Sequence, residues 1–154
     1  MMKFSSTKAN NLEAVRKWAK KQYSLGDSSI HGPEHWEKVF GNGVMLAGKT
    51  PGADVLVVKL FSLLHDCRRE NDHYDPDHGR RAAGELQRIN GSLLHLSDNQ
   101  LVLLEQACSG HADGYTSSNP TIGCCWDADR LELPRAGIKP RAQFLSTEAA
   151  RNLI

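Results

Sequence analysis

Histidine and aspartate occur in this chain at positions from which they could share a metal ion. His35 stands near the start of a helical stretch, His65 and Asp66 are adjacent at the end of an apolar stretch, and Asp129 lies late in the chain. The chain has seven histidines, which is more than packing alone requires. Imidazole and carboxylate ligands together suit Zn, Mn, Fe, Co or Ni better than an ion that binds only oxygen. The residue types and their order therefore indicate a divalent transition-metal site.

Several segments of the chain have helical periodicity, some with capping or acidic residues at their starts and glycine near their ends. Proline 33 fits the first turn of the helix that carries His35. Helices are expected over residues 12–23, 33–47, 75–89 and 97–110, with a short terminal helix starting at residues 146–148.

The apolar stretch that starts at Ala53 and runs into His65 is rich in β-branched residues, so a buried strand is a competing interpretation. Its length of twelve residues or more favours a buried helix. On a helix, His65 and Asp66 point about 100° apart, so both reach one ion only if it lies near the helix surface at that turn. The other ligands must then come from separate helices.

Three segments of the chain, HGPEHWEKV, LLHDCRREN and DADRLEL, resemble the HD superfamily of metal-dependent phosphohydrolases. The resemblance covers roughly residues 28 to 135. It implies an all-α fold, the HD-domain helical bundle. It also implies that His35, His65, Asp66 and Asp129 are the four metal ligands. Asp127 remains an alternative to Asp129 as the last ligand.

Two further histidines, His78 and His111, fall between the His-Asp doublet and the last aspartate. HD proteins with two metals or a phosphate-binding histidine carry additional histidines there, so one or two ions of Mn, Fe, Co, Ni or Zn are expected. If both bind a second ion, Asp66 would bridge the pair. If they do not, they contact phosphate or transfer a proton, and in either case they are candidate catalytic residues together with Asp66.

Basic residues near the expected ligands are candidates for phosphate contacts, because guanidinium binds phosphate oxygens in a bidentate manner. Arg69 is the preferred one and a candidate catalytic residue, since it lies one turn beyond the doublet; Arg80 and Arg81 are further candidates. His31 is a candidate for a substrate contact from the turn before residue 33.

Arg69 and Glu70 also mark a departure from the family. HD enzymes that hydrolyse guanosine alarmones have a Glu-Asp pair at these two positions, and the arginine removes the carboxylate that those enzymes use near the attacking water. Alarmone hydrolysis is therefore not expected. The Gly-Tyr-Pro tripeptide of cyclic-dinucleotide phosphodiesterases is absent from the sequence as well.

The resemblance implies a hydrolase that attacks a nucleotide or another small phosphate ester with a metal-activated water. Two alternatives remain open at this point. Some HD proteins are di-iron oxygenases, and the six expected ligands would satisfy two irons. A regulatory module that binds a metal or nucleotide without turnover is the alternative outside catalysis.

The chain of 154 residues is expected to form a single domain over residues 1–154. Its net charge of +1 favours neither nucleic acid nor a membrane surface as a partner. The longest apolar run, residues 55–64, is too short to span a membrane, and residues 1–11 lack the apolar core of a secretory signal. Four cysteines without zinc-knuckle spacing fit a reduced, cytoplasmic setting. A homo-oligomer is compatible with the sequence.

Overall fold

The computed structural model describes residues 9–154, and every regular element in this part of the chain is helical. The predicted all-α fold is confirmed. The expectation that residues 1–11 carry no secretory signal falls largely outside the described residues. The α-helices are α1 (Leu12–Gln22), α2 (Pro33–Gly48), α3 (Val55–Leu64), α4 (His78–Ile89), α5 (Asp98–Gly110), α6 (Pro120–Arg130) and α7 (Glu148–Arg151); two 3₁₀ helices, η1 (Leu133–Ala136) and η2 (Ala142–Phe144), lie between α6 and α7.

Side-chain caps fix where several helices begin. Asp54 accepts hydrogen bonds from the amides of the first turn of α3, and Asn119 does the same for α6. Ser97 and Gln100 form the capping box that the sequence predicts at the start of α5. α4 begins at His78 rather than at Asp75, because proline at position 76 keeps the preceding residue out of helical conformation.

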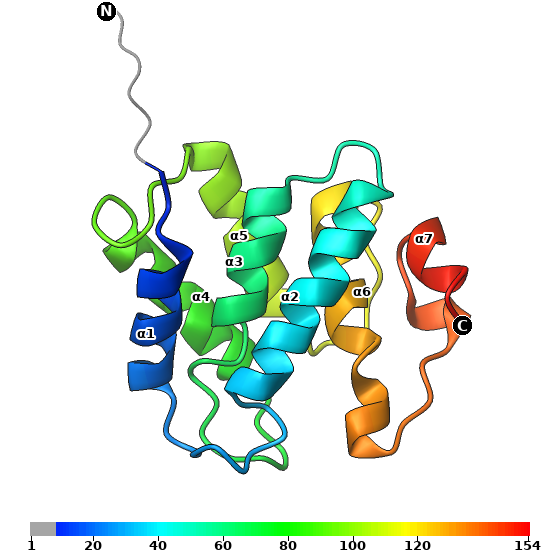
Figure 1. The fold of residues 1–154 in the computed structure, drawn as a ribbon, viewed down its shortest axis with the longest axis horizontal. Helices are drawn as coiled ribbons and strands as arrows, with labels where there is room; N and C mark the ends of the chain where they lie inside the picture. Colours follow the sequence, from blue (N-terminus) through cyan, green and yellow to red (C-terminus); the bar gives the residue numbers. More distant parts are fainter. Residues whose placement is uncertain (1–8) are drawn as a thin grey trace, which may run out of the picture.

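α3 runs through the middle of the molecule (Figure 1), and it contacts α1, α2, α5 and α6. Its residues from Val57 to Leu64 are buried except Lys59, so the helix is apolar on nearly every side. The competing strand interpretation of this stretch is thus wrong. Gly43 of α2 lies directly against α3, where an added Cβ atom would come 2.6 Å from Val58 Cγ1.

The expected ligands all lie at helix ends. His35 is in the first turn of α2, His65 directly follows α3, and His78 is the first residue of α4. His111 directly follows α5, and Asp129 is in the last turn of α6. Five helices therefore have to meet at one place to build the site.

The segment after α6 folds back along the molecule to α7, as the orange and red part of Figure 1 shows. Asp127 of α6 holds it there: its buried carboxylate accepts hydrogen bonds from Ser146 N, Thr147 N and Thr147 Oγ1, each at 2.7 Å. Thr147 also caps α7, which begins where the sequence predicts a terminal helix. Among residues 9–154, no helix is long and apolar enough to cross a membrane.

Candidate metal centre

His35, His65 and Asp129, from three different helix ends, are in mutual contact. The Nε2 atom of His35 lies 3.0 Å from Asp129 Oδ1 and 3.3 Å from His65 Nε2. The Nε2 atom of His65 lies 3.4 Å from the same Asp129 oxygen. We call these three residues the first group. Its ligand atoms lie within 4.8 Å of one another, close enough to bind a single ion.

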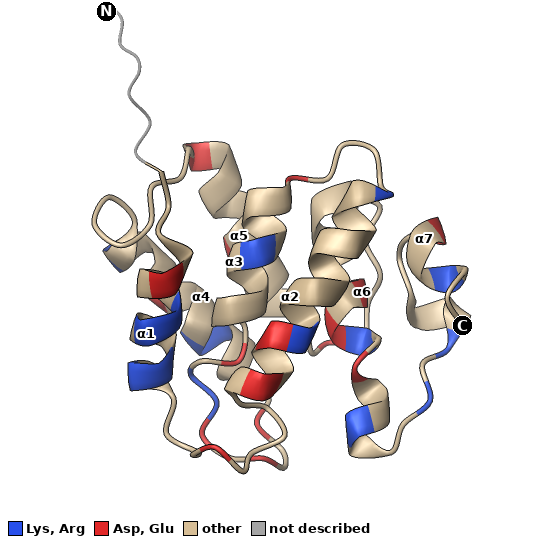
Figure 2. Cartoon of the chain, viewed as in Figure 1, with Lys and Arg blue, Asp and Glu red and all other residues tan. Residues whose placement is uncertain are grey.

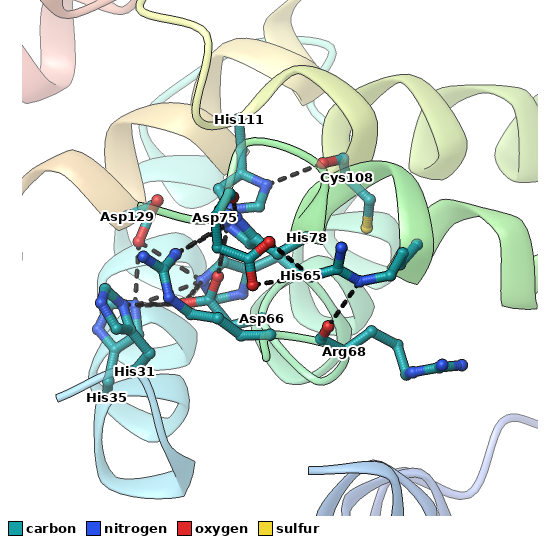
Figure 3. Close-up of polar contacts among 12 residues, drawn as sticks. His31, His35, His65, Asp66, Arg68, Asp75, His78, Cys108, His111 and Asp129 are labelled. Atoms are coloured by element: carbon teal, nitrogen blue, oxygen red, sulfur yellow. Dashed lines mark hydrogen bonds and ion pairs between the residues drawn. The ribbon is translucent and has the colours of Figure 1, made fainter. Parts of the chain in front are cut away.

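Asp66 lies between this first group and a second pair of histidines (Figure 3). Its Oδ2 atom is 3.3 Å from His65 Nε2 and 3.5 Å from His35 Nε2. Its Oδ1 atom is 3.1 Å from His78 Nε2 and 3.3 Å from His111 Nε2. We call His78 and His111 the second group. Each oxygen of the Asp66 carboxylate therefore faces a different group.

The two rings of the second group are brought together by close packing of α4 on the end of α5. The Nε2 atoms of His78 and His111 are 2.9 Å apart. Gly79 makes this approach possible, because any side chain there would collide with the main chain at Cys108. The absence of a side chain at Gly79 thus allows α4 to pack closely against the end of α5.

Main-chain carbonyls orient the rings from behind. In three rings the Nδ1 atom donates to a carbonyl oxygen: His65 to Phe61 at 3.0 Å, His78 to Asp75 at 2.6 Å, and His111 to Cys108 at 2.8 Å. A carbonyl only accepts, so Nδ1 carries a proton, and each ring in its neutral form presents its Nε2 lone pair to the site. Two such lone pairs at 2.9 Å repel each other unless a proton or a cation lies between them. The donor set therefore fits a divalent transition metal.

The charges of the site also favour a cation between the carboxylates. Burial by itself lowers the pKa of His65, but the charges of Asp66 and Asp129 outweigh it and raise the pKa to about 10. Burial opposes ionisation of the two carboxylates, yet His65 and its neighbours hold both carboxyl pKa values well below the usual range. Burial lowers the pKa of His111. In the metal-free protein, protons occupy the positive place that an ion would take.

Asp129, not Asp127, faces the histidines. Asp127 is fully buried on the other side of α6, where its carboxylate binds Ser146 and Thr147. Asp129 keeps 16% of its side chain exposed and lines the cavity above the site. The structure thus separates the two aspartates of the DAD motif into a structural one and a candidate ligand.

Arg69 is held in a fixed orientation at the edge of the second group. Its Nε atom donates to Asn71 O and its Nη2 atom to His73 O, both at 2.8 Å. Its Nη1 atom lies 3.2 and 3.3 Å from the two ring nitrogens of His78, so the guanidinium sits over the ring. The side chain is buried and lines the same cavity as Asp66.

Arg80 and Arg81 do not line that cavity. Arg81 forms an ion pair with Asp75, with Nη2 at 2.6 Å from Oδ1, and its Nε atom donates to Arg68 O at 3.1 Å. Arg80 is largely exposed and lies 3.3 Å from Asp113 Oδ2. The structure therefore places Arg81 behind the turn that carries Arg69, and places Arg80 on a neighbouring surface.

His31 lies at the rim of the site. Its Nδ1 atom is 3.7 Å from Asp66 Oδ2, and 3.3 Å from Arg135 Nη2. His31 O accepts a hydrogen bond from Trp36 Nε1 at 2.7 Å, which ties the turn before α2 to the first helical turn. His31 lines the cavity, as its prediction as a substrate contact requires.

A cavity of about 410 Å³ opens above Asp66, His78, His111 and Asp129. Its outer wall comes from the segment after α6, which the sequence reasoning did not connect with the site. That segment contributes three basic residues to the lining, Arg135, Lys139 and Arg141. The signal in the sequence was the composition of this segment: residues 133–147 contain three basic and no acidic residues.

Glu132 is a further residue that the sequence reasoning did not single out. Its Oε1 atom lies 3.5 Å from His35 Nδ1, on the side of the ring away from Asp129. It lies within the DADRLEL segment, but nothing in the spacing singled it out, because its contact with His35 depends on how α6 meets the start of α2.

Taken together, four imidazoles and two carboxylates meet at the base of a cavity with basic residues in its wall. Function has to be inferred from this arrangement. Comparisons with protein-family models, with curated proteins and with solved structures found no match to this chain.

Proposed function

We propose that the protein is a metal-dependent phosphohydrolase of the HD type that acts on a nucleotide or another small phosphate ester. One observation carries the proposal. The two carboxylate oxygens of Asp66 face two different groups of histidines, at the base of a cavity that Arg69 and Arg130 also line. Ligands for cations and donors for phosphate oxygens thus lie side by side in a space of ligand size.

His35, His65, Asp66 and Asp129 would hold one divalent cation. His78 and His111 could hold a second through the other oxygen of Asp66. When bound, such a cation lowers the pKa of a coordinated water toward 7 and polarises a phosphoryl oxygen.

Arg69 would bind a non-bridging phosphate oxygen. Its two hydrogen bonds to main-chain carbonyls fix the guanidinium plane before a substrate arrives, so little side-chain entropy is lost on binding. Its charge would stabilise the negative charge that develops on the phosphoryl group.

The second group would have another role if it binds no ion. His78 would be the residue to transfer a proton to the leaving oxygen. Its Nε2 atom would then have to carry the proton that lies between the two rings of the second group, and its ring lies beside Arg69 in the cavity lining. His111 suits that role less well, because burial lowers its pKa and keeps the ring neutral.

The test is a phosphatase screen with protein purified without chelators, using small phosphate esters and nucleotides. We expect phosphate release that chelation abolishes and that Mn²⁺ or another transition metal restores. Asp66→Ala should remove both the bound metal and the activity. An active Asp66→Ala variant, or a metal-loaded wild type that releases no phosphate from any ester, would contradict the proposal.

A di-iron oxygenase is the second candidate. It is favoured by the second group, because His78 and His111 bring the number of possible ligands to four histidines and two aspartates. The Asp66 carboxylate could bridge two irons, since its two oxygens face the two groups. Substrate-dependent oxygen uptake by the iron-loaded protein would support it over hydrolysis. Tight nucleotide binding with neither phosphate release nor oxygen uptake would instead indicate a regulatory module.

A further inference from the structure

The outer wall of the cavity is positively charged. Arg135, Lys139 and Arg141 line it, and the segment from residue 133 to 147 that carries them has no acidic residue. Figure 2 shows blue at several places along this segment between α6 and α7. Of the residues in the described range 9–154, Asp66 and Asp129 are the only acidic ones in the cavity lining, and both contact histidines at its base.

Two of these cations are free to bind an anion. Within residues 9–154, neither Lys139 nor Arg141 takes part in an ion pair or donates a side-chain hydrogen bond. The Arg141 guanidinium lies 5.5 Å from the centre of the Phe144 ring, a contact that leaves its N–H groups available. Arg135 is different, because it is already bound to Ile30 O at 2.8 Å and serves to fix the wall.

The Arg130 guanidinium adds a further, buried positive charge to the cavity lining. Arg130 lines the cavity and keeps only 7% of its surface exposed. Its Nη1 atom donates to Phe144 O at 2.7 Å, but its Nη2 atom is buried without a hydrogen-bond partner. Buried donors without a partner are rare and cost about 1–3 kcal/mol, so an anion nearby would offset an existing cost.

The cavity lining also contains apolar residues. Leu133, Ile138 and Phe144 are among them, and Ile138 and Phe144 are exposed. The Phe144 ring lies next to the Arg141 guanidinium, and an exposed aromatic ring beside a charged residue is a surface on which a flat ring can stack. The lining thus combines metal ligands, exposed apolar residues and basic residues.

We propose that the cavity selects a substrate with two separate anionic groups joined by a ring system. One phosphate would lie at the metal ligands beside Arg69, the ring against Phe144, and the second anionic group at Lys139 and Arg141. The chemical class is a small bisphosphate, such as a nucleoside with a single phosphate on each of its 3′ and 5′ oxygens, which is smaller and less charged than the guanosine polyphosphates. The place of the first phosphate rests on the proposed function; the second anionic position depends only on the outer wall.

The test compares adenosine 3′,5′-bisphosphate with adenosine 5′-monophosphate. Equilibrium binding to the metal-loaded protein is measured by calorimetry, and phosphate release is measured separately. We expect the bisphosphate to bind at least about 10-fold more tightly, since hydrogen bonds to a charged group are the strong ones. The double variant K139A/R141A should remove most of this difference and change monophosphate binding less than about threefold.

The matched control is K20A/K21A, which removes two exposed lysines from the last turn of α1, away from the cavity. It should keep the preference of the wild type. Equal binding of the two probes to the wild type, no binding of the bisphosphate, or an equal loss of both probes in K139A/R141A would overturn the inference. If neither probe nor any ester of the phosphatase screen is hydrolysed but K139A/R141A still loses the bisphosphate preference, the proposed function fails and this inference stands.

Discussion

Gly79 and Cys108 approach so closely that a Cβ atom at position 79 would lie 2.3 Å from the Cys108 carbonyl oxygen. That oxygen accepts the Nδ1 proton of His111, and His78 is the next residue before the glycine. Gly79→Ala should therefore push α4 away from α5 and separate the second group. We expect a loss of about 1–3 kcal/mol in the free energy of unfolding. Metal bound by the second group and phosphate-ester hydrolysis should fall with it.

Gly84→Ala is the control, since it lies on the same helix and an added Cβ atom meets nothing within 4 Å. It should leave metal content unchanged and stabilise the protein by up to about 1 kcal/mol, because alanine is the better helix former. Thermal unfolding and metal analysis of both variants check the prediction. Similar behaviour of the two alanine variants would show that the close contact does not matter.

The two aspartates of α6 should differ in their effect on metal binding when each is replaced by asparagine. Asp129→Asn should weaken metal binding strongly, and it should also lower the stability of the metal-free protein, since the carboxylate faces His35 and His65. Asp127→Asn should keep the metal but lower the free energy of unfolding by about 1–3 kcal/mol, since the carboxylate accepts hydrogen bonds from Ser146 and Thr147. Metal content and chemical denaturation of the chelator-treated variants distinguish the two. Loss of metal in Asp127→Asn alone would mean that the ligand is misassigned.

The number of ions per chain depends on the second group. If His78 and His111 are ligands, the metal-replete wild type should hold about two ions, and either alanine variant about one, because six protein ligands suffice for two ions. Metal analysis by mass spectrometry on desalted protein gives the number. A single ion in the wild type would assign the pair to phosphate contact or proton transfer, and in that case the alanine variants should lose activity without losing metal.

Replacing Arg69 should lower the activity on substrate and leave metal binding unchanged. Arg69→Ala should reduce kcat/KM on the best phosphate ester about 10- to 100-fold, the effect of losing a hydrogen bond to a charged group. Arg69→Lys should recover part of the loss, because the charge is kept but the fixed planar geometry is not. Metal content should stay at the wild-type level in both. The wild type should be a poor hydrolase of guanosine alarmones; efficient alarmone turnover would contradict this interpretation.

The stability of the metal-free protein should pass through a maximum in mildly acidic solution. Asp66 and Asp129 have folded-state pKa values below the ordinary 3.8, so their contribution is present above about pH 4 and is lost as the pH falls. The pKa of His65 is raised from 6.5 to about 10, so its contribution is complete below pH 6.5 and is lost as the pH rises toward 10. The thermal unfolding temperature of the chelator-treated protein should therefore be highest between about pH 4 and 6.5. Asp66→Ala should flatten this profile.

The affinity for the metal should increase with pH, over the range in which the stability of the metal-free protein falls. Because an ion has to displace the His65 proton, the apparent metal affinity should increase with pH over the range from 6.5 toward 10. Isothermal titration at several pH values measures both the affinity and the protons released. Affinity that does not change over this range would argue against His65 as a ligand.

The sequence was informative where local rules decide the structure. Caps, prolines and apolar periodicity place most of the helices, and His35, His65 and Asp66 lie at or just beyond helix ends that such rules locate. The helix that carries Asp129, α6, was not predicted by these rules. The fact that these ends converge follows from packing around α3, which no local rule specifies. The resemblance to a known family supplied the expectation of convergence, and the structure brings the four side chains together.

Other roles could not be derived from spacing. Arg80 and Arg81 are as close in sequence to the ligands as Arg69, yet they bind Asp113 and Asp75 outside the cavity, because α4 turns them away. Conversely, Lys139 and Arg141 are remote from every motif and reach the cavity only because the irregular segment after α6 is fixed by tertiary contacts.

The carboxylate of Asp127 has a consequence for how the chain can be shortened. The two amides and the hydroxyl that donate hydrogen bonds to this buried carboxylate belong to residues 146 and 147. The segment that leads into α7 therefore unfolds together with the rest of the domain. A chain cut before Ser146 would lose these three hydrogen bonds to a carboxylate together with the burial of Ala150, at a cost of several kcal/mol. That is a large part of the 5–15 kcal/mol by which domains are stable. A domain truncated to its metal-binding motifs would therefore lose much of its stability.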